Sequence, residues 1–483
     1  MIRLARITLV NPQISVTSWN SPLGPPLGSL DSTCIRLGLA YLSACLKNKG
    51  HKVELIDLRL LKGWKDYDTL LRKQHPEFLG VTMHTSEFDL AIECCRRAKA
   101  FDSAITTIAG GIHATMFSTK ILKTDQVDYV LKGEGEISFP KFIENPKNFS
   151  PSFWGETPDL NLLPLPDREL WSDYAKRVQF PLFSLLLPPT VDILTKRGCP
   201  WQCGFCCGPG EQNLYTTDSS KGARIPSIRQ RNVPNVMKEL TSLYNRYKFK
   251  SIVFHDDQFV IQPKWVEEFC QSMHNYGFVK NGVNWWAASR ADIIVKYPEL
   301  FKQMKEAGLT ILSVGFESFS NDMLKWINKG ITAEQSWEAV GILRKLGIQI
   351  YGNFIFGIPY SDGKWYPAYD VELAKAISQI KPEIISTSFF TPIPGSTLYE
   401  FCVKNNLILP SSTSKNLGLR FPNEGKIKGV DYKFLNKLLS SVLPKQPFFV
   451  RPAKTLQKTR FYTMVLLSLY PKIQLYLDRK RRP

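Results

Sequence analysis

The first third of the chain alternates between short apolar runs and amphipathic stretches. The runs are rich in β-branched residues, whereas the stretches place apolar residues three or four positions apart, as a helix does. The predicted strands are 6–10, 52–57, 78–82, 106–111 and 127–132, and the predicted helices are 37–47 and 89–101. Strands that alternate with helices predict a Rossmann-like, doubly wound α/β sheet, which binds ligands at the carboxyl ends of its strands.

Two of these predicted strands run directly into glycine-bearing turns. One turn contains Gly110 and Gly111, and the other contains Gly133, Glu134 and Gly135. Glycine allows the backbone to approach a bulky ligand closely. A tight turn without a ligand explains the glycines alone equally well.

A second alternating series begins near residue 191 and contains about six strand–helix units. The polar or glycine features that follow its strands are the cysteine loop from Cys199, Asp256-Asp257, Ser289-Arg290, Glu317-Ser318, Gly357-Ile358 and Pro392 to Gly395. This pattern predicts a partial (β/α)6 barrel of the TIM type, with its active site at that end.

These patterns predict four regions. Residues 1–145 form the first sheet domain, a proline-rich stretch at 146–185 forms a surface linker, and 186–400 form the barrel. Residues 401–483 lack the alternation, and we expect a basic region with a helical tail.

The composition is that of a globular protein. Of 483 residues, 43% are hydrophobic and 22% are charged, which excludes a largely disordered chain. No run of about 18 apolar residues is present, and the N-terminus resembles no secretion signal. We therefore expect a cytoplasmic protein whose cysteines serve as ligands rather than disulfides.

The formal charge of +19 leaves several partners open. Attraction to nucleic acid, anionic lipid or an acidic substrate is one interpretation, and a solvated basic surface is the other. The excess gathers after Arg451, where the tail also holds an apolar stretch at 461–470. Such a segment either lies on a membrane surface or docks on its own domain. Peripheral membrane association is thus an alternative to a purely cytoplasmic location.

Cys199, Cys203 and Cys206 are the most informative residues. Their spacing, Cys-x3-Cys-x2-Cys, brings three thiolates together on one loop. Three thiolates hold three irons of a [4Fe–4S] cluster and leave the fourth iron open to a ligand. A zinc site completed by Cys207 or a histidine is the alternative, although structural zinc sites usually use two separated pairs. We expect Cys207, adjacent to a ligand, to point elsewhere.

Residues 195–206 resemble the signature loop of the radical S-adenosylmethionine (SAM) superfamily. Further similarities follow in order at Phe254 to Asp257, Gly315 to Ser318, Asn353 to Pro359 and Thr391 to Gly395. The glycine turns of the first domain are similar to those of the cobalamin (B12)-binding class of this superfamily, which includes class B methyltransferases. The resemblance covers about residues 5–400.

The resemblance implies a set of site residues. Cys199, Cys203 and Cys206 would bind the [4Fe–4S] cluster and act in catalysis. Around SAM, Glu317 would accept from the ammonium and Arg290 would pair with the carboxylate. The other implied SAM contacts are Phe205, Gly315, Ser318, Gly357 and Ile358, and the implied cobalamin contacts are Gly110, Gly111, Gly133, Glu134 and Gly135. A surface ion pair is the alternative for Glu317. Asp256 and Asp257 would either reach ribose hydroxyls or substrate, or cap the next helix.

Many cobalamin domains carry the motif Asp-x-His-x-x-Gly, whose histidine binds the cobalt from below, and this motif is missing here. The loop after the first strand, from Asn11, contains no histidine. We therefore expect no histidine of this loop below the cobalt, and we interpret His113 as a structural residue.

The resemblance implies an enzyme that reductively cleaves SAM to a 5′-deoxyadenosyl radical, most simply for methyl transfer to an unactivated carbon. The alternative is cyclisation, coupling or rearrangement without methylation. A methylthiotransferase would need further clustered cysteines, and a non-catalytic iron–sulfur or zinc module that binds nucleic acid is the remaining class. The expected partners are an electron donor such as flavodoxin or ferredoxin and a small-molecule substrate, for which the basic, apolar tail makes a lipid one interpretation. The aromatic residues near predicted strand ends either line an apolar substrate pocket or belong to the core; they are Trp285, Trp286, Phe389 and Phe390.

Overall fold

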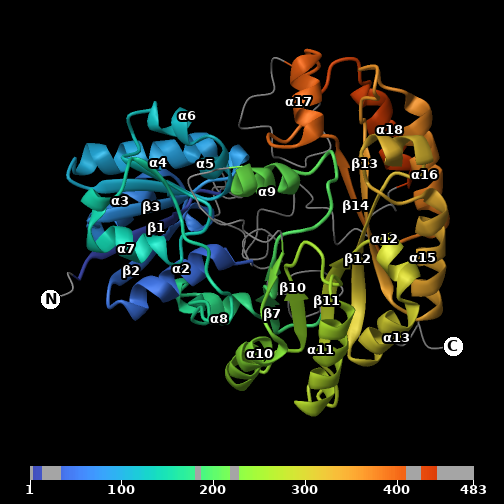
Figure 1. Cartoon of the computed structure of the whole chain (residues 1–483), viewed down its shortest axis with the longest axis horizontal. Coiled ribbons are helices and arrows are strands. Elements are labelled where there is room, and N and C mark those ends of the chain that lie inside the picture. Colours follow the sequence, from blue (N-terminus) through green and yellow to red (C-terminus); the bar gives the residue numbers. More distant parts are fainter. Residues whose placement is uncertain (1–3, 14–33, 180–185, 218–227, 410–425, 443–483) are drawn as a thin grey trace, which may run out of the picture. The chain divides into compact units, whose positions relative to one another are not determined.

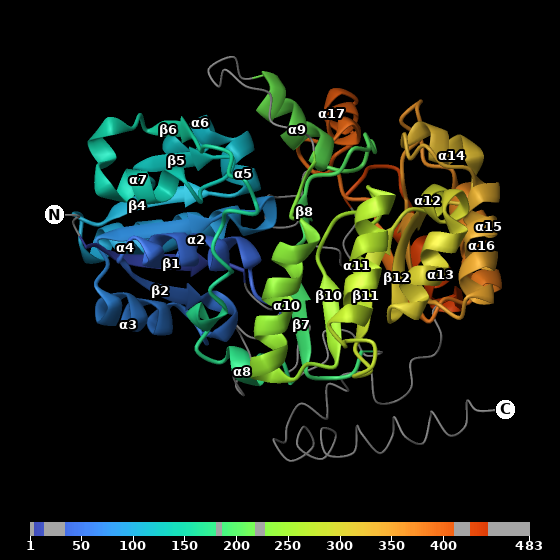
Figure 2. The same ribbon diagram turned by 60° about the horizontal axis from the view of Figure 1, so that its bottom comes forward.

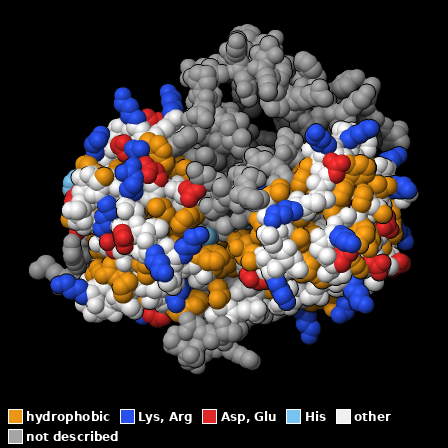
Figure 3. All heavy atoms as spheres, turned by 90° about the horizontal axis from the view of Figure 1, so that it is seen from above, with side chains coloured by type: hydrophobic (Ala, Val, Ile, Leu, Met, Phe, Trp, Pro, Cys, Tyr) orange, Lys and Arg blue, Asp and Glu red, His pale blue; other side chains and the backbone are white. Residues whose placement is uncertain are grey.

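The computed structural model describes residues 4–13, 34–179, 186–217, 228–409 and 426–442. Residues 1–438 form one compact unit, and residues 439–483 form a second. The basic tail from Arg451, including 461–470, lies outside the described residues. No helix among those described is long and apolar enough to cross a membrane. Figure 3 shows one face of the molecule, on which Lys and Arg side chains lie among Asp and Glu side chains.

The N-terminal part contains a parallel six-stranded sheet in the order β2-β1-β3-β4-β5-β6. Figure 2 shows β2 at one end of this sheet and β6 at the other. The strands are β1 (Arg6–Asn11), β2 (Lys52–Asp57), β3 (Phe78–Thr82), β4 (Thr106–Gly110), β5 (Tyr129–Lys132) and β6 (Ser152–Trp154). The predicted doubly wound sheet is confirmed, and its order is the flavodoxin-like one, which binds ligands where β1 and β3 diverge.

Helices separate these strands along the chain. They are α2 (Leu37–Asn48), α3 (Trp64–Gln74), α4 (Phe88–Phe101), α5 (Ile112–Met116), α6 (Ser118–Leu122) and α7 (Ser138–Glu144), with short 3₁₀ turns at Leu58–Leu60, Thr85–Glu87 and Pro146–Asn148. Cys94 and Cys95 on α4 pack into the hydrophobic core with Val81 and Val130. These two cysteines are therefore core residues.

The prediction that residues 146–185 form only a surface linker is wrong in part. Residues 152–154 are β6, which pairs with β5, and Trp171 is buried with its indole Nε1 2.9 Å from Asp57 Oδ2. The segment also contains η4 (Arg168–Leu170) and α8 (Tyr174–Arg177). Its prolines separate short ordered pieces whose aromatic side chains have apolar area to bury.

The second sheet is also parallel, in the order β7-β10-β11-β12-β13-β14. Its strands are β7 (Thr190–Ile193), β10 (Ser251–Phe254), β11 (Asn284–Ser289), β12 (Leu309–Glu317), β13 (Gln349–Phe356) and β14 (Ile384–Phe389). A separate two-stranded antiparallel sheet pairs β8 (Lys196–Arg197) with β9 (Arg229–Gln230). The predicted partial barrel of six βα units is confirmed.

Helices cover one face of this second sheet (Figure 1). They include α10 (Val233–Tyr247), α11 (Pro263–Asn275), α13 (Pro298–Glu306), α15 (Ala333–Lys345) and α16 (Pro367–Ile380), and the remaining helices are α9 (Gly208–Thr217), α12 (Ala291–Lys296), α14 (Asn321–Trp326), α17 (Thr397–Lys404) and α18 (Tyr432–Val442). Along β13, buried residues alternate with half-buried ones. One face of the strand thus packs on helices, while the other lines the inside of the half-barrel.

Candidate functional site

The cysteine loop begins where β7 passes into β8, and a buried carboxylate holds that point. Asp256, just beyond β10, accepts hydrogen bonds from the backbone N–H groups of Thr195, at 2.7 Å, and Lys196, at 3.1 Å. It also accepts one from the Thr195 hydroxyl. Asp256 thus fixes the start of the loop and does not cap the next helix. Gly198, with φ of +91°, then turns the chain into Cys199.

The middle of the loop docks on the segment 327–330, which follows α14. The N–H of Gly204 donates to the carbonyl of Ile327 at 2.7 Å, and Asn328 Nδ2 donates to the carbonyl of Gln202 at 2.7 Å. A Cβ on Gly204 would lie 3.2 Å from the Ile327 oxygen, so the close approach favours glycine. The sequence motifs gave no sign of this docking segment.

The three thiols differ in their environments. Burial raises the pKa of Cys199 to about 11 and also raises the pKa of Cys203. A hydrogen bond from Cys207 and another from the Gly208 N–H lower the pKa of Cys206 to about 7. The negative charge of Cys203 and of Cys206 also contributes to the raised pKa of Cys199, after burial. Among the described residues, no group of three or more His, Cys, Asp and Glu side chains is drawn together as ligands of a metal ion.

Arg290 lies against the cysteine loop rather than apart from it. Its Nη1 is 3.8 Å from Cys203 Sγ, and its guanidinium lies 4.7 Å from the centre of the Trp201 ring. Nη2 donates to the carbonyl of Lys329 at 2.7 Å, and Nε pairs with Asp292 at 2.9 Å. A fixed cation beside Cys203 favours its thiolate, the form that binds iron.

Glu317 ends β12 and forms a buried ion pair that sequence reasoning missed. Its Oε1 lies 3.1 Å from Lys329 Nζ, and both side chains are largely buried. Lys329 Nζ also lies 5.6 Å from the centre of the Phe205 ring, beside the third cysteine. The ion pair covers Gly315, where a Cβ would lie 2.5 Å from Glu317 Oε1 and 2.8 Å from Lys329 Nζ. Lys329 had no signal in the sequence, because its place at this site comes from the turn after α14.

The other predicted SAM contacts, Ser318, Gly357 and Ile358, have partners other than the Glu317–Lys329 ion pair. Ser318 is buried and its hydroxyl accepts from the N–H of Ser320 at 3.2 Å. Gly357 directly follows β13 with φ of +74°, and its N–H donates to Asp370 at 3.0 Å. Added at Gly357, a Cβ would lie 3.0 Å from Leu435, so this glycine packs on α18. Ile358 is buried.

The first sheet has its own pocket, with an empty volume of about 460 Å³. Glycine backbone forms much of its wall, and the remaining lining is mainly aliphatic. The glycines are Gly80, Gly110, Gly111, Gly133 and Gly135. Next to Gly110 only the Leu131 oxygen, at 3.8 Å, would meet a Cβ, so that wall is open. The pocket lies at the carboxyl ends of β3, β4 and β5, where such sheets bind ligands.

Glu134 is turned toward arginines rather than lining the pocket. It pairs with Arg197 of β8 and with Arg229 of β9. His113 is buried, contacts Thr85 Oγ1 at 3.1 Å, and burial lowers its pKa to about 4. We therefore keep His113 as a structural residue.

The residues present fit the groups that the sequence motifs imply. Three thiols on one loop, with an N–H group and cations beside them, suit an iron–sulfur cluster, whose sulfurs carry negative charge. Backbone without side chains around the first pocket suits a bulky ligand that must approach closely.

Comparison with known proteins agrees with this reading. A family model for the radical SAM superfamily matches residues 193–370, and one for the B12-binding domain matches residues 26–143. An uncharacterized methyltransferase of Pyrococcus horikoshii is 26% identical, over 86% of each chain. The hopanoid C-3 methylase of Methylococcus capsulatus is 26% identical, over 74% of this chain and 67% of its own.

A solved structure shares the fold. It is that of the radical SAM methyltransferase TsrM from Kitasatospora setae with cobalamin and a [4Fe–4S] cluster, with a TM-score of 0.63, 15% identity and 92% of each chain covered. The two domains imply a [4Fe–4S] cluster, SAM and cobalamin, which confirms the predicted cofactors. The chain thus belongs to the radical SAM superfamily, in the class that carries a B12-binding domain before the radical SAM domain.

Proposed function

We propose that the chain is a cobalamin-dependent radical SAM methyltransferase that acts on an unactivated carbon. The observation that carries this proposal is the presence in one compact unit of a three-cysteine loop and a glycine-walled pocket. When bound, the cluster supplies the electron that cleaves SAM, and cobalamin carries the methyl group. The relatives named as methyltransferases support this choice over cyclisation or rearrangement.

The site residues take the following roles in this proposal. Cys199, Cys203 and Cys206 hold the cluster, and Arg290 stabilises the Cys203 thiolate from 3.8 Å. Glu317 accepts from the SAM ammonium, while Lys329 holds its carboxylate in place. Phe205 and the Gly357–Ile358 turn contribute to the adenine pocket, and Gly110, Gly111, Gly133 and Gly135 to the cobalamin pocket.

The inner face of the half-barrel supports a substrate site beside the cofactors. Trp286 is half-buried there, with its ring centre 6.4 Å from that of Tyr351. Trp285 points the other way and is fully buried among Phe254, Phe259 and Phe269. Of the two tryptophans, only Trp286 thus stays a candidate for substrate contact.

The decisive experiment separates ligand cysteines from their neighbour. Cys199, Cys203 and Cys206 are each replaced by Ala, and Cys207→Ala is the matched control. After anaerobic reconstitution, we expect the three variants to lose most cluster iron and SAM cleavage, and the control to retain both. Cluster iron retained without Cys203 would contradict the assignment.

Product analysis then tests the reaction class. With cobalamin, SAM and a reductant, we expect 5′-deoxyadenosine and a substrate gain of one methyl group. Deoxyadenosine with an altered but unmethylated product would favour cyclisation or rearrangement.

The partners are a small-molecule substrate and an electron donor such as flavodoxin or ferredoxin. A lipid substrate reached through the basic tail is the narrower version. Flotation with anionic liposomes tests it: the full chain should float and a chain without residues 451–483 should not. Equal behaviour of both would remove the membrane part of the proposal.

A further inference from the structure

The turn after β5 carries two glutamates that form ion pairs with arginines of the two-stranded β8–β9 sheet. Arg197 Nη2 lies 2.5 Å from Glu136 Oε1, and Arg197 Nη1 lies 3.2 Å from Glu134 Oε1. Arg229 Nη1 donates to Glu134 Oε2 at 2.9 Å. Two carboxylates and two guanidinium groups thus form one network between residues far apart in the sequence.

These ion pairs are withdrawn from solvent. Glu136 is 5% exposed and Glu134 13%, while the two arginine side chains are each 17% exposed. Partly buried pairs are screened little by salt, and removing one partner leaves an uncompensated charge. The network therefore has more effect on structure than a surface ion pair.

The network lies between the two candidate cofactor sites. Glu134 stands between Gly133 and Gly135, which both line the pocket of the first sheet. Arg197 stands two residues before Cys199 on the continuous chain of the cysteine loop. The glycine turn therefore cannot shift without moving Arg197 or breaking its ion pairs.

The other side of the turn is closed by backbone. A Cβ on Gly155, just beyond β6, would lie 1.6 Å from the Glu134 carbonyl oxygen, and the Gly155 N–H donates to the Lys132 carbonyl at 2.8 Å. The turn is thus held between β6 on one side and Arg197 on the other.

We propose that Arg197 is a positioning residue, which holds the glycine turn of the cobalamin pocket in register with the loop that carries the cluster cysteines. This proposal rests on the proposed function only in taking the pocket as the cobalamin site. Neutralising Arg197 leaves Glu136 without its arginine and Glu134 with Arg229 alone, which loosens the turn and weakens cobalamin binding, while the three cysteines still assemble the cluster.

The test compares three variants with the wild type after anaerobic reconstitution. Arg197→Gln removes the charge, Arg197→Lys keeps it, and Arg344→Gln breaks an arginine–glutamate pair elsewhere, between α15 and Glu383. The measurements are iron content and the dissociation constant of hydroxocobalamin, titrated by absorbance. We expect Arg197→Gln to keep its iron and bind cobalamin at least about tenfold more weakly, with partial recovery in Arg197→Lys and no change in Arg344→Gln.

Unchanged cobalamin affinity in Arg197→Gln would overturn the proposal. Joint loss of iron and cobalamin would also overturn it, since that result indicates general destabilisation. If Arg197→Gln does not fold, Glu136→Gln takes its place, because Glu136 pairs with Arg197 in the network. A wild-type chain that binds no cobalamin would instead refute the proposed function.

Discussion

At the scale of single residues, the most constrained point is the end of β12. Glu317 has φ of +62°, a left-handed conformation that costs a non-glycine residue energy, and the register with β13 shifts between Gly315 and Glu317. Such strain is found at binding sites, where surrounding contacts enforce it. Here the Lys329 ion pair supplies one such contact, 3.1 Å from Glu317 Oε1.

Gly315→Ala tests whether this arrangement serves SAM. The added methyl group would overlap both Glu317 Oε1 and Lys329 Nζ and would displace the ion pair. We expect SAM affinity, measured by equilibrium dialysis on the reconstituted protein, to fall by about 10–100-fold. Gly341→Ala is the matched control, because nothing lies within 4 Å of its Cβ position in α15, and it should bind SAM as the wild type does. Equal affinity in both variants would remove Glu317 from the SAM site.

At the scale of elements, the cysteine loop is held by three segments distant in sequence. Asp256 beyond β10 fixes its start, Ile327 after α14 fixes its middle, and Leu398 of α17 donates to the Gly204 carbonyl at 2.9 Å. The cysteine spacing alone identified the loop, because ligand geometry is local. Its supports were not predictable, because hydrogen bonds across 60 residues or more leave no periodic signal.

Asp256→Asn tests the first support. An amide of the same size loses the negative charge that two N–H groups share, and one of its two acceptor positions becomes a donor. We expect the variant to incorporate clearly less iron on reconstitution, as measured by iron and sulfide content. Asp125→Asn, at an exposed residue of the first sheet domain, is the control and should load normally. Full iron loading in Asp256→Asn would show that the loop forms without this carboxylate.

At the scale of the whole molecule, the strands were predictable and the joints between elements were not. Lys52–Asp57 and Phe78–Thr82 were predicted to the residue. Phe78–Thr82 lies inside the parallel sheet and is mainly apolar, whereas Lys52–Asp57 is an edge strand whose apolar residues are bounded by charged ones. β6 was missed, because three residues among prolines resemble a loop. The hydrophobic pattern also could not reveal that Arg168, within the predicted linker, is buried.

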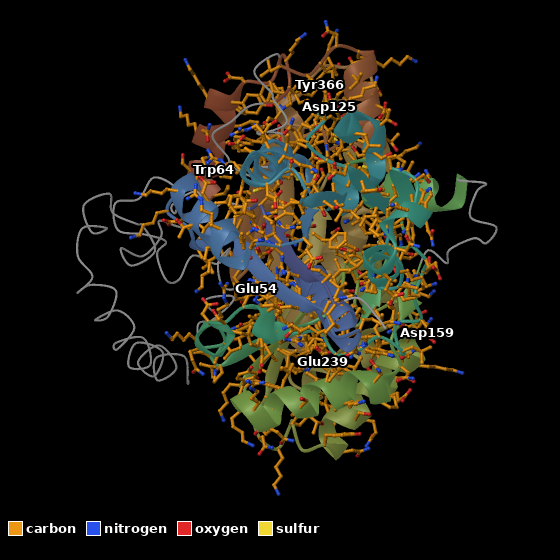
Figure 4. The ribbon with its side chains drawn as sticks, turned by 90° about the vertical axis from the view of Figure 1, so that its left-hand side faces the viewer. Glu54, Trp64, Asp125, Asp159, Glu239 and Tyr366 are labelled. Carbon is orange, nitrogen blue, oxygen red and sulfur yellow. The ribbon has the colours of Figure 1, made fainter. Side chains whose placement is uncertain are left out.

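One such joint is a buried ionic network around Glu239 of α10, which is labelled in Figure 4. Arg168 Nη1 lies 2.7 Å from Glu239 Oε1, and Arg231 Nη1 lies 2.5 Å from Oε2. Arg231 also donates to the hydroxyl of Tyr41 on α2, at 3.3 Å. This ionic network around Glu239 therefore connects the first sheet domain, the intervening segment and the barrel.

Glu239→Gln follows from this arrangement. The substitution leaves two guanidinium groups buried without their shared counter-charge, and breaking a buried pair in this way costs about 3–5 kcal/mol. We expect the urea midpoint of unfolding, followed by circular dichroism on the chain without its iron–sulfur cluster, to fall clearly. Glu299→Gln, at a side chain 83% exposed, should leave that midpoint unchanged. Since a chain of this size need not unfold in one step, both sheets should be followed by separate probes. An unchanged midpoint in Glu239→Gln would mean that the charge of this carboxylate does not hold these parts together, since Arg168 and Arg231 would then be stabilised without it.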